Sequence, residues 1–267
     1  MRFSHFLMFS IMILFFSCGK GKVSHLEVNS SGVIVGNELP DWKVLSEESE
    51  KGLEYSSLPV GLLNTNGYRC TGFLVGHDHI MTNHHCIPDQ KTADATFFTL
   101  QRWATDYSGK TYLDRETFRC NLLTINNKEL DFALVRCQNS PGKQFGFVKL
   151  SEEDTQGSTL IEVVHHNCDY FRLPANCTPQ KLLSMGEILP KYSQNTFFHT
   201  ADTLAGSSGA PIFSSQTGEV IGLHNSGYFN EEDRKKGTGF YNGAIKINKI
   251  IQYINENLPH FEWRPSN

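Results

Sequence analysis

The sequence predicts an all-β fold, a barrel or a sandwich, followed by one helix near the end of the chain. From Leu58 onward, short apolar runs alternate with Gly, Asn, Asp and Pro; examples are residues 72–75, 132–135, 160–164, 210–213 and 220–223. Runs of this length between turn residues are typical of antiparallel strands. The 22 glycines, 19 phenylalanines and 9 tyrosines also favour turns and strands.

The helix is predicted by a change of period after the last apolar run. Apolar residues recur there at the spacing of an amphipathic helix: Ile247, Ile250, Ile251, Ile254 and Leu258. Pro259 is expected to end the helix, because proline cannot continue the backbone hydrogen bonding.

The composition excludes several classes of protein. Of the 267 residues, 39% are hydrophobic and 19% are charged, and the net charge is -4. This balance is that of a folded globular chain rather than a disordered or multi-span membrane protein. Without a basic surplus, binding to nucleic acid through its phosphates is not expected. No residue spacing indicates a metal, nucleotide or haem, so we expect no cofactor.

Residues 1–17 are expected to be an export signal. The apolar run Phe6–Phe16 is too short for a bilayer, which needs about 20 residues. Cys18 follows directly, and the arrangement resembles a bacterial lipoprotein signal, in which this cysteine becomes the lipid-modified first residue. We therefore expect an exported protein, secreted or anchored through Cys18 in the bacterial cell envelope. The alternative is an ordinary signal with a different cleavage site.

The other six cysteines form an even set, which in an exported chain indicates disulfides. Fifteen pairings of six cysteines are possible. Pairing of nearest neighbours is the simplest: Cys70–Cys86, Cys120–Cys137 and Cys168–Cys177. A hairpin turning at Asn126-Asn127 would place the second pair on opposite strands.

Three separated motifs carry catalytic residue types. Between Cys70 and Cys86, a strand, a turn and a second strand deliver His85, and histidine exchanges protons near neutral pH. Asp131 opens an apolar strand, where a carboxylate needs a partner such as an imidazole. Residues 206–211, Gly-Ser-Ser-Gly-Ala-Pro, allow a sharp turn that exposes one serine hydroxyl and converges backbone N–H groups on an anion.

Together these motifs resemble the chymotrypsin-like serine proteases, specifically the bacterial glutamyl-endopeptidase branch, over about residues 33–258. The anchors are Thr82-Asn83-His84-His85, Asp131-Phe132-Ala133-Leu134, Gly206-Ser207-Ser208-Gly209-Ala210-Pro211, Val220-Ile221-Gly222-Leu223-His224 and Tyr241-Asn242-Gly243-Ala244. Their order of His, Asp and Ser agrees with that family and contradicts the order in α/β-hydrolases.

The resemblance implies two six-stranded antiparallel β-barrels and a C-terminal α-helix. We assign residues 18–57 to a tether and lead-in, 58–145 to the first barrel, 146–245 to the second and 246–267 to the helix and tail. The resemblance also implies a serine endopeptidase that acts as a monomer on a polypeptide. Ser208 would be the nucleophile, His85 the base and Asp131 its orienting group, with an oxyanion hole at the N–H groups of Gly206 and Ser208.

Some neighbouring residues offer alternatives to these assignments. The family that the chain resembles places its catalytic histidine directly before the cysteine, so the resemblance puts His84 outside the triad. It likewise implies that Ser207 is not the nucleophile. His77 and His79 together with the pair at 84–85 suggest a metal site, but their spacing favours turn and surface histidines. His165 and His166 are expected to pack or to face solvent.

The specificity pocket is ambiguous. Thr203 and His224 match the positions that contact a substrate Glu in the glutamyl branch, and they suit a carboxylate. Asp202, however, stands where the trypsin branch binds Lys or Arg. The next strand, including Asn225 and Gly227, should pair with substrate backbone. Cleavage after Glu or Asp is favoured over cleavage after Lys or Arg.

Val33-Ile34-Val35-Gly36-Asn37 resembles the mature N-terminus of the branch. Cleavage after Gly32 would mature the enzyme and release it from a lipid anchor, but we favour an uncleaved first strand. A trypsinogen-type ion pair is excluded, because Ser207 replaces the required Asp. Two other functions are open: a catalytically silent envelope protein that binds through the same fold, and an esterase with the same triad.

Overall fold

The computed structural model describes residues 27–29, 32–36, 39–53, 57–155, 159–172 and 175–263. The expected signal and Cys18 lie outside these residues, so the lipid anchor stays a prediction. Among the residues described, no helix is both long and apolar enough to cross a bilayer.

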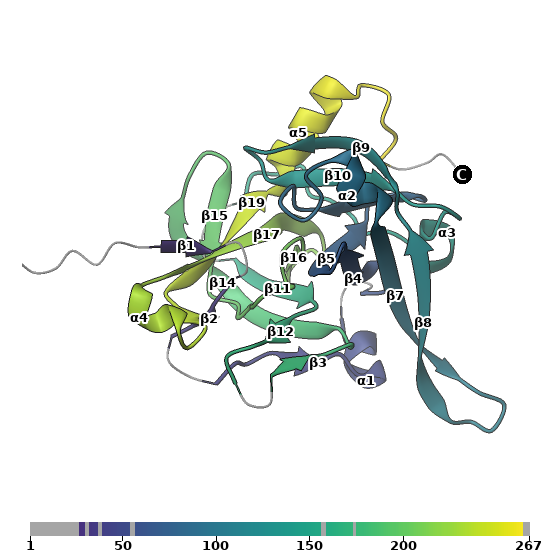
Figure 1. The fold of residues 1–267 in the computed structure, drawn as a ribbon, viewed down its shortest axis with the longest axis horizontal. Coiled ribbons are helices and arrows are strands. Elements are labelled where there is room, and N and C mark those ends of the chain that lie inside the picture. Colours follow the sequence, from purple (N-terminus) through teal and green to yellow (C-terminus); the bar gives the residue numbers. More distant parts are fainter. Residues whose placement is uncertain are drawn as a thin grey trace, which may run out of the picture.

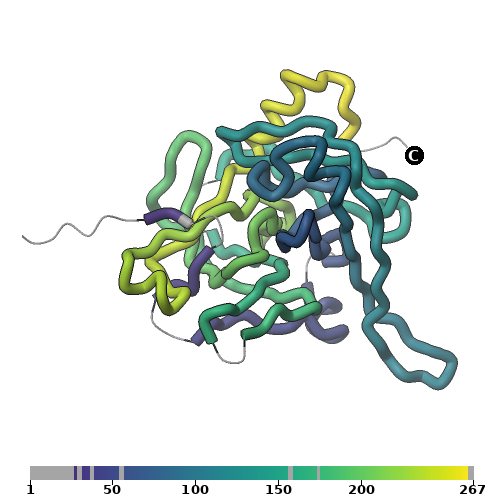
Figure 2. The backbone as a smooth tube through the Cα atoms, viewed as in Figure 1, coloured from purple at the N-terminus to yellow at the C-terminus, as the bar shows by residue number. Residues whose placement is uncertain are grey.

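The first half of the chain forms a seven-stranded antiparallel sheet (Figure 1). Its strands, in spatial order, are β8 (Thr111–Arg119), β7 (Thr96–Thr105), β4 (Val60–Thr65), β5 (Tyr68–Leu74), β6 (His79–Thr82), β10 (Phe132–Arg136) and β9 (Leu122–Asn127). Two short helices, α2 (Gln90–Asp94) and α3 (Gly142–Phe145), lie between strands. The β7–β8 hairpin extends well beyond the body of the molecule (Figure 2).

The second half forms a closed barrel of six antiparallel strands. Its order is β17 (Val220–Phe229), β16 (Pro211–Ser214), β11 (Leu160–His165), β14 (Leu182–Tyr192), β15 (Thr196–His199) and β19 (Tyr241–Lys246). Pairing of β19 with β17 closes the ring. All of the apolar runs predicted as strands lie in these two units, and the predicted all-β fold is confirmed.

The lead-in is tied to the second barrel at three places. β1 (Glu27–Asn29) pairs with β17, β2 (Ile34–Val35) with β18 (Thr238–Gly239), and β3 (Lys43–Val44) with β14. The remaining short elements are α1 (Glu47–Lys51), β12 (Cys168–Asp169), β13 (Asn176–Cys177) and α4 (Glu231–Arg234). The described part of the lead-in therefore belongs to the folded unit rather than to a loose tether.

The C-terminal helix α5 (Ile247–Asn257) forms where its period predicts it. Four isoleucines of its apolar stripe are buried in the same core as residues of both sheets, including Phe73 and Phe213. Burial of each such isoleucine contributes about 1.5–3 kcal/mol. The helix ends before Leu258 and Pro259, as expected, and it lies over the junction of the two halves (Figure 1).

The structure forms the three predicted disulfides: Cys70–Cys86, Cys120–Cys137 and Cys168–Cys177. The hairpin around the second pair turns later than predicted. Asn126 and Asn127 are the last residues of β9, and the turn lies at 128–131. The side chain of Asn127 accepts the N–H of Leu130 at 2.8 Å, which stabilises the turn one step further along the chain.

Candidate active site

His85 is held by one carboxylate at two points. Its Nδ1 lies 2.9 Å from Oδ2 and 3.1 Å from Oδ1 of Asp131, and its backbone N–H donates to Oδ1 at 3.0 Å. The Cys70–Cys86 disulfide fixes the next residue to β5. With Nδ1 facing the carboxylate, Nε2 is the ring nitrogen left for proton exchange with another group.

Asp131 adopts a backbone conformation that is rare for its residue type. Its φ is +40°, in the left-handed region, at the end of the turn before β10. The side-chain amide of Asn83 donates to its carbonyl at 2.9 Å, and the amide of Asn225 donates to its Oδ2 at 3.3 Å. Strained residues that are held by several neighbours are typical of functional sites.

Ser208 lies at the centre of a turn that only glycine permits. Gly206 and Gly209 have φ values of +97° and +84°. A Cβ on Gly209 would lie 2.2 Å from the carbonyl oxygen of Thr71, far inside contact distance. The same Thr71 donates its N–H to the carbonyl of Ser208 at 2.8 Å, so β5 of the first sheet holds the turn of the second barrel.

The proposed nucleophile and base face a common space. Ser208, His85 and Gly206 line one cavity of about 350 Å³, together with Arg69 and Tyr68 of β5. His85 comes from the turn that follows β6 of the first sheet, and the other two come from the turn before β16. The junction of the two halves therefore brings together residues more than 120 positions apart in sequence.

A match to a family model decides the family. The model of the trypsin-like peptidase domain matches residues 70–223, which span β5 to β17 and contain all three triad candidates. The chain belongs to this family.

The chain spans less than half the length of the two curated relatives that it matches. The chain is 28% identical over 175 residues to Secreted RxLR effector protein 73 of Plasmopara viticola, covering 61% of this chain and 42% of that protein. It is 28% identical over 174 residues to the uncharacterized protein y4fB of Sinorhizobium fredii, covering 59% and 25%. A solved Glu endopeptidase structure superposes with a TM-score of 0.59 and 18% identity, over 85% of this chain and 100% of that one. This last likeness shows the fold.

In this trypsin-like peptidase domain, two candidate pocket residues converge on one point. His224 and Thr203 are fully buried, and neither His224 Nε2 nor Thr203 Oγ1 has a hydrogen-bond partner among the described residues. A Cβ built on Gly32 would lie 3.0 Å from this Nε2 and 2.2 Å from this Oγ1. The two polar atoms thus lie beside Gly32, on the side to which a side chain at this position would extend.

The ring of His224 is held on its other side by His199, whose Nε2 lies 3.4 Å from His224 Nδ1. Burial lowers the pKa of His224 to about 3 and lowers the pKa of His199 well below its ordinary value. Both rings are neutral in the folded chain at neutral pH.

Described residues before Val33 lie along the strand expected to bind substrate. Strand β1 pairs with β17, placing Asn29 opposite Gly227. A Cβ on Gly227 would lie 2.5 Å from the carbonyl carbon of Gly32. Val33 is buried, and its N–H donates to Asn242 Oδ1 at 2.8 Å. In the intact chain, β1 occupies the edge of β17, and Gly32 occupies the space in front of the pocket atoms.

Asp202 is directed away from that space. Its Oδ1 accepts the N–H of Val35 at 2.8 Å, and its Oδ2 accepts the N–H of Asp41 at 3.1 Å. Burial raises the pKa of Asp202 to about 6, opposed by these two hydrogen bonds. Its carboxylate fastens the lead-in.

The remaining candidate histidines have different neighbours and do not form one site. His79 contacts Asp78 at 2.7 Å and packs on Phe261, while His77 packs on Phe147. In the described part of the chain, no group of three or more His, Cys, Asp or Glu side chains is arranged to hold a metal. His165 and His166 were expected either to pack in the interior or to face solvent. Both are buried, so they pack in the interior.

Sequence reasoning missed the contacts of His165 and of Asn225. His165 Nδ1 lies 2.8 Å from Ser207 Oγ, beside the nucleophile. A histidine ending the mainly apolar run at residues 160–164 was the available signal. No local signal marked the contact of Asn225 with Asp131, because it joins two separate sheets.

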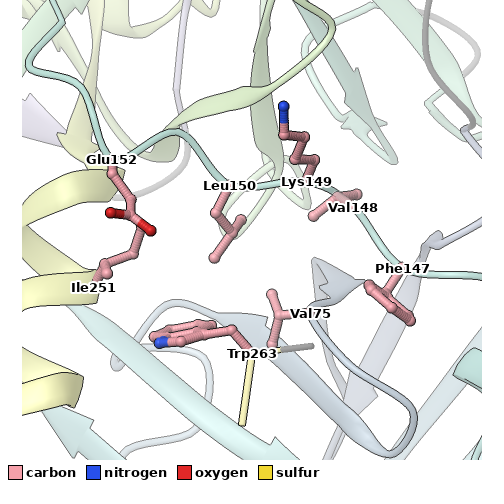
Figure 3. A pocket seen from close by; sticks show the side chains of 8 residues that line it. All are labelled: Val75, Phe147, Val148, Lys149, Leu150, Glu152, Ile251 and Trp263. Carbon is pink, nitrogen blue, oxygen red and sulfur yellow. The ribbon is translucent and has the colours of Figure 1, made fainter. Parts of the chain in front are cut away.

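A larger cavity, of about 560 Å³, lies away from these residues (Figure 3). The chain that connects the two halves forms one side of it, and helix α5 and Trp263 form the other; Val75 and Leu150 point into it. Its lining is mainly apolar and contains none of the catalytic candidates, so we place the chemistry in the smaller cavity.

Proposed function

We propose that the chain is an exported serine endopeptidase with the triad His85, Asp131 and Ser208. The observation that carries the proposal is the double contact of His85 with Asp131, beside a cavity that His85 shares with Ser208. This contact fixes the tautomer that a general base needs. Membership of the trypsin-like peptidase family supports the same assignment.

In the proposed reaction, Ser208 Oγ attacks the scissile carbonyl while His85 Nε2 takes the hydroxyl proton. The carbonyl π electrons move to oxygen, and the N–H groups of Gly206 and Ser208 stabilise this oxyanion. His85 returns the proton to the leaving amine, which leaves an acyl-enzyme. Water then repeats the steps and releases the acid. Each oxyanion donor is expected to contribute about 3 kcal/mol.

The pocket geometry favours a carboxylate side chain at the cleavage site. Thr203 Oγ1 and His224 Nε2 are buried and point at one position, where a carboxylate would receive two hydrogen bonds. The Asp202 oxygens already accept two backbone N–H groups elsewhere. We therefore propose cleavage after Glu or Asp rather than after Lys or Arg.

The same geometry makes the intact chain a latent form. Because Gly32 lies where the substrate side chain would bind, and β1 covers the edge of β17, substrate needs this segment to leave. We therefore propose cleavage after Gly32, and not the uncleaved first strand that the sequence alone favoured. The predicted disulfides, now present in the structure, and the word "secreted" in the name of one relative support export.

The test is cleavage mapping on an unfolded protein, with new termini determined by mass spectrometry. The chain from residue 19 and a chain that starts at Val33 are compared, each with Ser208→Ala as control. Cuts after Glu or Asp that disappear in the control support the proposal. Cuts after Lys or Arg would contradict the pocket assignment. Absence of cuts, and of labelling by a fluorophosphonate in both chains, would instead support a silent binding protein.

A further inference from the structure

The side chain of Ser207 points into the second barrel, although its neighbour Ser208 faces the cavity. Ser207 is fully buried and lies in the turn between the two residues whose N–H groups form the proposed oxyanion hole. Its backbone N–H donates to the carbonyl of Leu204 at 3.0 Å. A group that holds the Ser207 side chain therefore also holds the peptide units on each side of it.

The partner of Ser207 is His165, the last residue of β11. His165 is fully buried, with Nδ1 2.8 Å from Ser207 Oγ and Nε2 3.0 Å from Ser184 Oγ on β14. The ring of Trp42, from the lead-in, packs on the imidazole nearly at right angles, with 6.3 Å between the ring centroids. The ring is thus fixed by two strands and the lead-in.

The hydrogen bonds run in one direction along this chain of side chains. Ser184 donates its hydroxyl to the carbonyl of Asp202 at 2.7 Å, so its oxygen accepts from His165 Nε2–H. His165 Nδ1 is then an acceptor and takes the hydroxyl of Ser207. The oxygen of Ser207 in turn accepts the N–H of Leu204 at 3.3 Å.

A neutral imidazole satisfies every member of this network. A second proton on His165 would leave the Ser207 hydroxyl without an acceptor, in a site with no water-exposed surface. Burial lowers the pKa of His165 to about 3, in agreement with the neutral ring that the hydrogen bonds require.

We propose that His165 is a positioning residue for the nucleophile turn. Through Ser207 it fixes the peptide unit that carries the N–H of Ser208, and with it the turn that begins at Gly206, so that both N–H groups point at the developing oxyanion. This inference rests on the proposed function, because it concerns how the oxyanion hole is held. It predicts an effect on acylation rate that exceeds any effect on substrate binding.

Acylation by p-nitrophenyl acetate tests the inference, because its burst reports Ser208 without requiring knowledge of the natural substrate. The measurement uses the form of the protein, intact or cleaved before Val33, that gives a burst. Ser207→Ala removes one oxygen and leaves His165 in place. We expect its acylation rate to fall at least tenfold with KM within threefold. Ser214→Ala, a buried serine at the β16 turn, is the matched control and should stay within threefold.

Two substitutions at His165 separate the hydrogen bond from packing. Asn can offer an oxygen to the Ser207 hydroxyl, whereas Leu fills the space without an acceptor. We expect His165→Asn to recover at least fivefold in acylation rate over His165→Leu. When His165→Leu is combined with Ser207→Ala, the loss should not exceed the larger single loss, because both changes break the same link.

Equal rates for the Asn and Leu variants, or a wild-type rate for Ser207→Ala, would overturn the inference while leaving the proposed function standing. The Ser207 result decides the matter if the His165 variants do not fold. A wild-type protein without a burst in either form would overturn the proposed function and this inference with it.

Discussion

The side-chain amide of Asn225, on β17, donates to Oδ2 of Asp131 at 3.3 Å and so joins the second barrel to the carboxylate that orients His85. The hydroxyl of Ser226 donates to Asn225 Oδ1 at 3.0 Å and keeps the amide in the donating orientation. The carboxylate of the proposed triad is therefore held from both halves of the molecule.

Substitution at Asn225 should lower activity through Asp131. We expect Asn225→Ala to reduce kcat/KM about tenfold, the effect of losing one hydrogen bond to a charged group. Asn225→Asp should cost more and move the acid limb of the pH–rate profile to higher pH, because a second carboxylate favours the imidazolium. Ser226→Ala is the milder control. An Asp variant with an unmoved acid limb would contradict the contact.

Asp131→Asn tests the triad itself. The amide keeps the shape of the side chain but cannot hold the imidazole tautomer that takes the serine proton, so we expect kcat to fall by about four orders of magnitude near neutral pH. Fluorophosphonate labelling of Ser208 should slow in parallel, while the unfolding midpoint changes little. Labelling at the wild-type rate would remove Asp131 from the mechanism.

Thr203→Val should weaken the preference for acidic residues. The substitution keeps the shape of the buried side chain and removes the hydroxyl that points at the pocket. We expect kcat/KM for a Glu peptide to fall tenfold or more, with little change for a matching Gln peptide. The control is Asp202→Asn, which should leave the preference intact, because its oxygens bind the lead-in. Loss of specificity in that control alone would make Asp202 the pocket base.

A substitution that displaces Gly32 from the candidate pocket should raise the activity of the intact chain. Gly32 and Gly36 have similar φ values, +77° and +84°, but only a Cβ on Gly32 would collide with the pocket, 2.2 Å from Thr203 Oγ1. Gly32→Ala should therefore increase the p-nitrophenyl acetate burst. Gly36→Ala carries the same backbone strain and should not increase it. Equal bursts from both variants would argue against a latent intact chain.

Acid should destabilise the second barrel. Burial lowers the pKa of His165, His166 and His224 to about 3, below the value of about 6.5 expected in the unfolded chain. The unfolded state therefore binds more protons below pH 6.5, and each histidine costs about 1.4 kcal/mol of stability per pH unit until pH approaches 3. Asp202, with its pKa raised to about 6, opposes this by at most one proton between pH 6 and 4.

Urea unfolding at pH 7, 6 and 5 measures this slope. Unfolding should take up at least one net proton between pH 6 and 5. The exposed His260 supplies the control, because His260→Gln should leave the slope unchanged. A free energy of unfolding that stays constant or increases as the pH is lowered would contradict the inference that the buried histidines are neutral.

The choice of His85 over His84 and of Ser208 over Ser207 depended on the family resemblance, whereas the all-β class, the disulfide pairs and the motifs that hold the triad candidates could be predicted from local patterns in the sequence. Each depends on a short stretch of chain: an apolar run between turn residues, cysteines flanking a hairpin, or glycines on both sides of Ser208. Strand formation and tight turns are governed by neighbouring residues, so these patterns keep their meaning without tertiary information.

The contacts between buried polar groups, in contrast, follow from tertiary packing. Asp202 faces the lead-in rather than the pocket, His165 holds Ser207, and Gly32 lies against Thr203. In each case the partners are separated by 42 positions or more and come from different strands or segments. The direction of a buried side chain depends on which strand packs beside it, and the closure of the barrel, not the local sequence, fixes that neighbour.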